Sequence, residues 1–166
     1  MNQHQGQIGK QVAVNIQARF DAPSGRVQGR IFVSGLADET MVDREFAAKS
    51  HFEGNFQAVR EAIKYVTEHE SQVRGYSVAF FTNAVTHRLL TEDNLHSPEL
   101  LRIRNEIAEL LAGLDAHGIS FSFNARPAKK FGTGDEDAMN RDGANVFAKE
   151  ESQPKKWYNR FVGAKS

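Results

Sequence analysis

The sequence contains no cysteine, few prolines and no long apolar run. Without cysteine the chain has no disulfide framework, no thiolate metal site and no cysteine nucleophile, and we expect it to work in a reducing compartment. No apolar run approaches the length of a membrane span. The first ten residues are polar and rich in glutamine, so we expect no signal peptide, a cytoplasmic location and no membrane partner.

An excess of charge of either sign is also missing. The 21 basic residues equal the 21 acidic ones, so no overall field draws the chain towards nucleic acid. Residues 152–166 nevertheless carry four basic residues and no acid, which leaves 17 basic against 21 acidic residues elsewhere. We expect three parts: a flexible polar N-terminus (1–10), one globular domain (11–151) and a basic, aromatic C-terminal tail (152–166).

Hydrophobic periodicity predicts the elements of that domain. Apolar and polar residues alternate strictly over 11–20, as in a half-buried strand, and the apolar run 76–81 is typical of a strand buried on both faces. Ser97 and Pro98 form a helix start, with a capping hydroxyl before a proline. The expected strands span 11–20, 27–36, 41–49, 76–81 and 119–123, and the expected helices span about 53–68, 84–91, 98–117 and 139–151.

This order, β-β-β-α-β-α-α-β-α, predicts an α/β fold with a mixed five-stranded sheet and helices on both faces. Over residues 11–151 the order and spacing resemble the ribonuclease H fold. The most specific stretch is the C-terminal third, with a long helix, a strand at 119–123, a basic loop and a helix containing Asn140-Arg141-Asp142 and Asn145. No short motif in it is diagnostic alone.

The resemblance implies a site, because active members of that family place four carboxylates around two divalent metals. The four matching positions of this chain all hold amides: Asn15 or Gln17, Gln57, Asn83 and Asn145. The family's histidine before the last helix is also missing, since residues 124–130 contain none. Amides are neutral ligands, so we expect a degenerate site with no catalytic residues and no metal or other cofactor. On this interpretation the protein is a pseudo-nuclease and not an enzyme.

Two alternatives remain beside this interpretation. In the first alternative, the amides are ordinary strand-end and helix-surface residues that match the pattern by chance. In the second, a different acid set, drawn from Asp21, Asp142 and the cluster Asp135-Glu136-Asp137, restores metal binding.

Basic residues near aromatic ones form the remaining candidate site. Cations hold phosphates and aromatic faces stack on bases, which suits nucleic acid. The candidate nucleic-acid-binding residues are Lys129, Lys130, Lys155, Lys156, Trp157 and Arg160. The same tail also suits a protein partner, because Trp, Tyr and Arg are enriched at interface hot spots. In a third interpretation Trp157 and Phe161 fold back onto the core of the domain.

The leading functional hypothesis is therefore a non-catalytic ribonuclease H-like module that binds nucleic acid, in particular RNA or an RNA–DNA hybrid. The alternative is a protein-interaction or scaffold subunit of a nucleoprotein assembly. A metal-dependent nuclease with shifted carboxylates is the third hypothesis.

Overall fold

The computed structural model describes residues 10–92, 95–126 and 156–162. The strands are β1 (Gln11–Asp21), β2 (Arg26–Ser34), β3 (Thr40–Ala47), β4 (Ser77–Thr82) and β5 (Ser120–Ala125). The helices are α2 (His51–Glu68), α3 (Glu70–Val73), α4 (Ala84–Thr91), α5 (Pro98–Ala116) and the 3-10 turn η1 (Trp157–Arg160). Every expected strand, and every expected helix within the described residues, is present.

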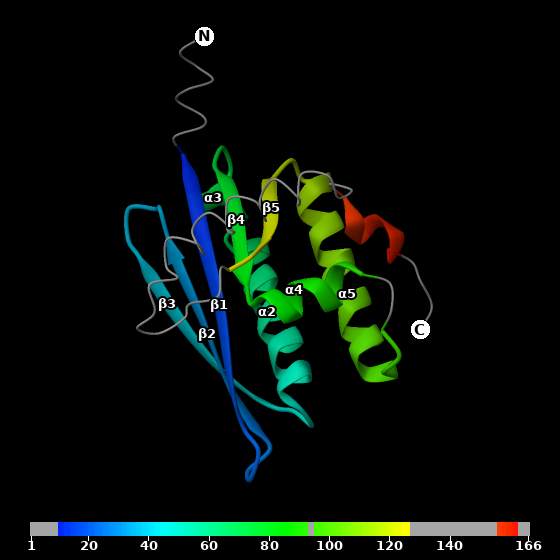
Figure 1. Cartoon of the computed structure of the whole chain (residues 1–166). Coiled ribbons are helices and arrows are strands. Elements are labelled where there is room, and N and C mark those ends of the chain that lie inside the picture. The colour runs from blue at the N-terminus through cyan, green and yellow to red at the C-terminus, as the bar shows by residue number, and fades with distance from the viewer. Residues whose placement is uncertain (1–9, 93–94, 127–155, 163–166) are drawn as a thin grey trace, which may run out of the picture.

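The strands form one mixed sheet with the order β3-β2-β1-β4-β5 (Figure 1). β1 pairs antiparallel with β2 and parallel with β4, while β2 pairs antiparallel with β3 and β4 parallel with β5. The expected α/β class with a mixed five-stranded sheet is thereby confirmed. The helix expected over residues 139–151 lies outside the described residues, as does the boundary expected at residue 151.

The core lies between the sheet and one layer of helices, α2 and α5 (Figure 1). The alternation in β1 buries Val12, Val14 and Ile16 on this side, where they meet the apolar faces of the two helices. The opposite face of β1, β2 and β3 carries mainly polar side chains, together with Phe32 and Met41, and is called the open face below. Among the described residues, no helix is long and apolar enough to cross a membrane.

Glycines and caps set the ends of the elements. Gly35 adopts a φ of +105°, which ends β2 at Ser34, two residues before the expected end. α2 begins at His51, two residues before the expected start, because the side chain of Ser50 accepts a hydrogen bond from the backbone N–H of Glu53. The carboxylate of Glu53 in turn accepts a hydrogen bond from the backbone N–H of Lys49. The side chains of Ser50 and Glu53 thus each satisfy one backbone N–H group at the start of α2.

Gly54 lets α2 approach β2 closely, since an added Cβ would lie 2.5 Å from a methyl carbon of Val27. We expect Gly54→Ala to lower the free energy of unfolding by about 1–3 kcal/mol through overpacking. Gly113 in α5 is a matched control, because an added Cβ there meets no atom within 4 Å. Gly113→Ala should raise stability by up to about 1 kcal/mol through helix propensity. Urea denaturation of both variants measures whether each substitution lowers or raises the free energy of unfolding. Equal effects of the two substitutions would contradict the close packing of Gly54 against Val27.

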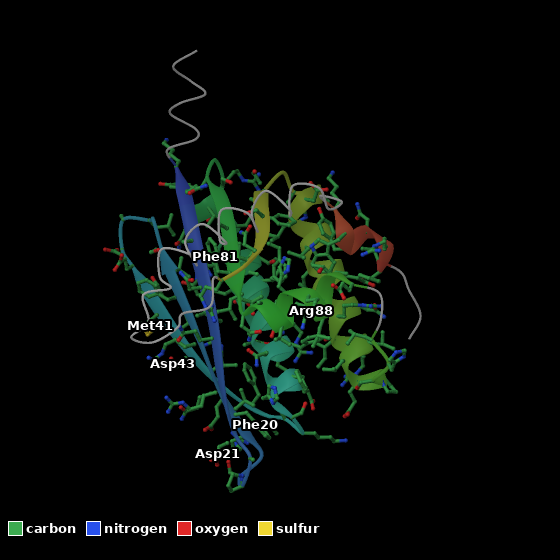
Figure 2. All side chains as sticks on the ribbon, viewed as in Figure 1. Phe20, Asp21, Met41, Asp43, Phe81 and Arg88 are labelled. Atoms are coloured by element: carbon green, nitrogen blue, oxygen red, sulfur yellow. The ribbon has the colours of Figure 1, made fainter. Side chains whose placement is uncertain are left out.

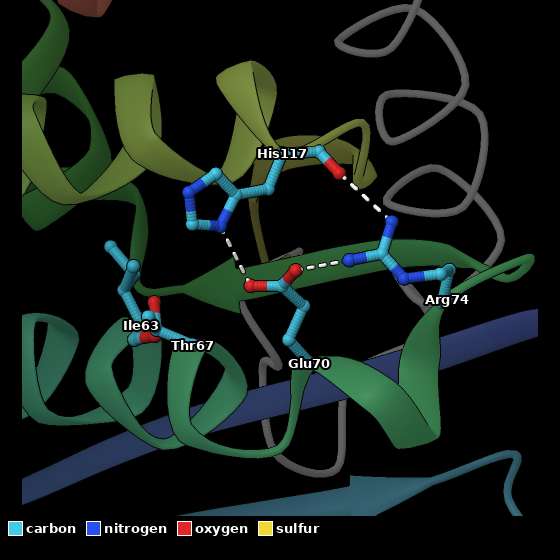
Figure 3. A network of polar contacts seen from close by, with 5 residues as sticks. All are labelled: Ile63, Thr67, Glu70, Arg74 and His117. Atoms are coloured by element: carbon cyan, nitrogen blue, oxygen red, sulfur yellow. Dashed lines mark hydrogen bonds and ion pairs between the residues drawn. The ribbon is translucent and has the colours of Figure 1, made fainter.

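A polar network joins α3 to the end of α5 (Figure 3). The carboxylate of Glu70 accepts a hydrogen bond from His117 Nδ1 at 2.8 Å and pairs with the guanidinium of Arg74. Arg74 Nη1 also donates to the backbone carbonyl of His117 at 3.0 Å. The hydrogen bond from His117 is the main cause that lowers the pKa of Glu70 below 4.5, and the charges of His117 and Arg74 act in the same direction.

This network predicts an acid-sensitive contribution to stability. A carboxylate whose pKa is lower in the folded than in the unfolded state stabilises the fold above its unfolded value, and that contribution disappears as the pH falls through the folded value. The difference in unfolding free energy between wild type and Glu70→Gln should therefore be present at about pH 6 and vanish on acidification below 4.5. Thermal unfolding as a function of pH measures it. A difference that persists unchanged in acid would argue against the network.

Candidate functional site

Two asparagine side chains meet where β4 ends. Asn83 follows β4 directly and caps α4, because its Oδ1 accepts from the backbone N–H of Thr86 at 2.7 Å. Its Nδ2 donates to Oδ1 of Asn55 in the first turns of α2 at 2.9 Å. Asn55 Nδ2 donates to the carbonyl of His51 at 2.8 Å, so hydrogen bonds fix the orientation of both amides. The two side chains form an asparagine pair at the carboxyl end of a buried parallel strand.

The structure thus places Asn55, and not the predicted Gln57, against Asn83. Gln57 Nε2 donates to the carboxylate of Glu53 at 3.3 Å, and its Oε1 is buried without a hydrogen-bond partner in the described part of the chain. Asn55 and Gln57 are two residues apart in α2, so their side chains point about 200° apart around the helix axis and only one of them can face Asn83. The capping pattern Ser50-x-x-Glu53 is the sequence signal that could have located Asn55.

The other two predicted positions within the described residues lie on the open face. Asn15 and Gln17 alternate with Val14 and Ile16, which are buried on the helix side. Asn15 pairs in register with Phe81 of β4, so it lies beside the end of that strand. Gln17 lies two residues farther along β1, beyond the last residue of β4 that pairs with β1. Both amides therefore lie near the end of β4 on the open face, whereas Asn55 belongs to α2 on the helix side.

A cation that sequence reasoning had not selected completes this end of the sheet. Arg126 follows β5, and its backbone N–H donates to the carbonyl of Thr82 at 2.6 Å. Its Nη1 donates to the carbonyls of Ile16 at 2.7 Å and Phe81 at 3.4 Å, so the guanidinium bridges β1 and β4 where their ladder ends. Burial lowers the pKa of Arg126, but a guanidinium stays protonated at neutral pH. The sequence signal that could have identified Arg126 is its position as a basic residue directly after the last strand.

The predicted basic and aromatic residues fall into two groups. Lys129, Lys130, Lys155 and Asn145 lie outside the described residues. In the described segment Trp157 is only 6% exposed and packs against Phe123 and Phe161, with ring centroids 5.6 and 6.1 Å away. This is the interpretation in which Trp157 and Phe161 fold back onto the core, and it leaves the Trp157 ring no free face for a base.

The two predicted cations of this segment also have structural partners. Lys156 pairs with Asp115 at 3.0 Å, and Arg160 Nη2 donates to the carbonyl of Thr91 at 2.6 Å. Arg104 of α5 lies over the ring of Phe161, 3.5 Å from its centroid. Tyr158 follows Trp157 in the same segment, and burial is the main cause that raises the pKa of Tyr158 to about 12. Lys156 and Arg160 thus help to attach η1 to α5 and to the end of α4.

The chemistry of the strand end follows from these groups. Amides donate and accept hydrogen bonds without charge, and a fixed guanidinium favours an anion. Two divalent cations need several carboxylates to offset their repulsion, and the groups present at this end in the described ranges do not fit that requirement. Nor does any cluster of histidine and acidic residues among the described residues have the arrangement of a metal site.

Comparison with known proteins gives the fold its name. No protein-family model matches the chain, and no curated protein matches its sequence. Among solved structures, the chain is similar to RNase H1 from Halobacterium salinarum, with 13% identity, a TM-score of 0.54, and coverage of 82% of this chain and 93% of that one. It is also similar to the N-terminal RNase H domain of a Mycobacterium tuberculosis protein, with 8% identity, a TM-score of 0.56, and coverage of 82% and 95%.

A third similar structure is an RNase H1 isolated from compost by a metagenomic approach, with 9% identity and a TM-score of 0.54 over 86% of this chain and 99% of that one. The chain therefore has a ribonuclease H-like fold, as the order of elements predicted. The expectation that it is not an enzyme is contradicted, because all three structures are of ribonucleases H. That expectation rested on residue types at four assumed positions, one of which, Asn145, lies outside the described residues.

Proposed function

We propose that the chain is a ribonuclease H-like domain that binds nucleic acid, RNA or an RNA–DNA hybrid, at the carboxyl end of β4. The observations that carry this proposal are the asparagine pair Asn55–Asn83 and the guanidinium of Arg126, which donates to the carbonyl of Phe81 two residues before Asn83. These groups come from three separate segments and lie near the end of β4, where ligands of open α/β sheets commonly bind.

The donors at this end suit a nucleic-acid strand. A guanidinium recognises phosphate oxygens, and asparagine amides recognise sugar hydroxyls, phosphates and base edges. The net charge of the chain is zero, so this binding rests on locally placed donors and not on a global field. The similarity to three ribonucleases H supports a nucleic acid as the ligand.

Nuclease activity is a second candidate function, and the same three similarities favour it. Its metal ligands would have to include acids outside the described residues, since amides and a guanidinium occupy the described strand end. Asp142 is the acid whose position in the sequence is nearest to the predicted Asn145. Cleavage of a hybrid with Mg²⁺ or Mn²⁺ that disappears in Asp142→Ala is the result that would establish this candidate.

The test of binding is a titration of labelled single-stranded RNA, single-stranded DNA and hybrid duplex, at low and at physiological salt, with Mg²⁺ present and the products separated on a gel. We expect binding of RNA or hybrid that weakens steeply as salt rises, because phosphate contacts release counterions. Asn83→Asp keeps the helix cap but adds a negative charge at the proposed site.

That variant should lower the affinity about tenfold, since two charges about 4 Å apart interact by about 1–4 kcal/mol near a protein surface. Gln72→Glu is the matched control, because it adds a negative charge on exposed α3, which precedes the amino end of β4. Its affinity should stay within about twofold of wild type. If both variants bind as wild type does, or wild type binds no nucleic acid, the proposal is wrong.

A further inference from the structure

A groove of about 650 Å³ crosses the open face, where β1, β2 and β3 extend beyond the end of β4. Asp43 on β3 and Phe81 on β4 mark two sides of this face (Figure 2). The groove is lined mainly by long polar side chains, and Arg126 reaches it from the end of β5. The principal side-chain donors are Gln17, Arg19, Gln28, Arg30 and Arg126. Arg44 alternates with Asp43 and Glu45 and pairs in register with Gly29, so its side chain lies on the opposite face of the sheet.

The charges in the groove do not cancel. Asp43 and Glu45 are its two acids, and each pairs with an arginine of β2, at 2.9 Å with Arg30 and at 2.7 Å with Arg26. Across residues 10–92, 95–126 and 156–162, no carboxylate pairs with Arg19 or Arg126. The groove therefore keeps a surplus of guanidinium groups, although the whole chain is neutral.

Arg126 is the most firmly held of these donors. The two main-chain carbonyls that accept from its Nη1 fix the plane of the guanidinium. Its Nε and Nη2 donate to no acceptor in the described ranges, which leaves donors for a ligand. A planar guanidinium held in this way binds phosphate with two parallel hydrogen bonds and loses little conformational entropy on binding. Gln17 and Gln28 add neutral donors on the neighbouring strands.

We propose that this groove is a phosphate-binding site, in which Arg19 supplies charge and Arg126 supplies a fixed donor pair. The ligand is a phosphate ester. If the proposed function holds, it is the backbone of the bound strand as it leaves the end of β4, and this part of the inference rests on that function. A free phosphate compound such as a nucleotide is the other source of the same chemistry.

The experiment compares the full chain with Arg19→Gln, which removes an exposed cation and leaves Arg126 and its carbonyl contacts in place. Arg102→Gln is the matched control, because it removes an exposed cation from α5 on the helix side. The probes are inorganic pyrophosphate, followed by chemical shifts, and a single-stranded RNA, followed by its affinity at several salt concentrations. Thermal unfolding checks that both variants fold.

We expect Arg19→Gln to weaken binding of at least one probe about fivefold or more and to reduce the salt slope for RNA by about 1, while the control stays within about twofold. Loss of RNA binding alone identifies the nucleic-acid backbone as the source. Pyrophosphate binding that needs Arg19, in a chain that binds no RNA, supports the groove and overturns the proposed function.

Two outcomes overturn the groove. RNA binding that is equal in wild type and Arg19→Gln, without pyrophosphate binding that depends on Arg19, is compatible with the proposed function and contradicts the groove as a phosphate-binding site. Absence of binding to either probe removes both proposals.

Discussion

Replacement of Trp157 by alanine should lower the free energy of unfolding by about 3–5 kcal/mol, the usual cost of truncating a large buried aromatic side chain. Trp157 is 6% exposed and contacts the rings of Phe123, Tyr158 and Phe161. Its loss would open a cavity between β5 and the C-terminal segment and weaken the attachment of η1 to α5. Urea denaturation of the full-length variant measures the effect.

Val162→Ala is the control in the same segment, because Val162 is 43% exposed. We expect that change to alter stability by no more than about 0.5 kcal/mol. A Trp157→Ala variant that unfolds like wild type but binds RNA less tightly would contradict the packed position. It would return the tail to the role of a binding element.

The double variant Asn55→Asp/Asn83→Asp should acquire a Mn²⁺ response that wild type lacks. The Asn83 Nδ2 atom lies 2.9 Å from Asn55 Oδ1, so the substitution would place two carboxylates side by side. Without metal they repel each other, and we expect a loss of stability of about 1–4 kcal/mol at neutral pH. A bound dication removes the repulsion, and at a hundred times its dissociation constant it adds about 2.7 kcal/mol.

Thermal unfolding with and without Mn²⁺ tests this expectation, and the single variant Asn83→Asp is the control. Aspartate caps a helix as well as asparagine does, so the start of α4 should survive in both variants. Only the double variant should show a large upward shift of the unfolding temperature with Mn²⁺. Equal shifts in Asn83→Asp and the double variant would mean that the two side chains do not meet at the end of β4.

Most of the fold could be predicted from local sequence patterns, because each pattern has one dominant physical cause. The alternation over 11–20 places Val12, Val14 and Ile16 on one face, and burial of that face determines the strand. The cap and proline at Ser97-Pro98 set the start of α5 within one residue. Boundaries that depend on backbone conformation were less exact, as at Gly35, whose positive φ ends β2.

The candidate site could be predicted only in part, since it depends on contacts between distant segments. Asn83 was identified from its place after an apolar strand, but its partner Asn55 depends on where α2 begins. Arg126 is separated by 110 residues from the carbonyl of Ile16 that it contacts, and no periodicity encodes such a pair. Residue type alone also led to the wrong expectation about enzymatic activity, which the similarity to three ribonucleases H contradicts.

The most direct test of the account is an NMR titration of the isotope-labelled full-length chain with an RNA–DNA hybrid. The account predicts that the side-chain amides of Asn55 and Asn83 and the Nε of Arg126 shift first and saturate together, while resonances of α3 at the opposite end of β4 stay in place. Shifts confined to α3 and the end of α5, or no shift at saturating hybrid, would contradict nucleic-acid binding at this strand end.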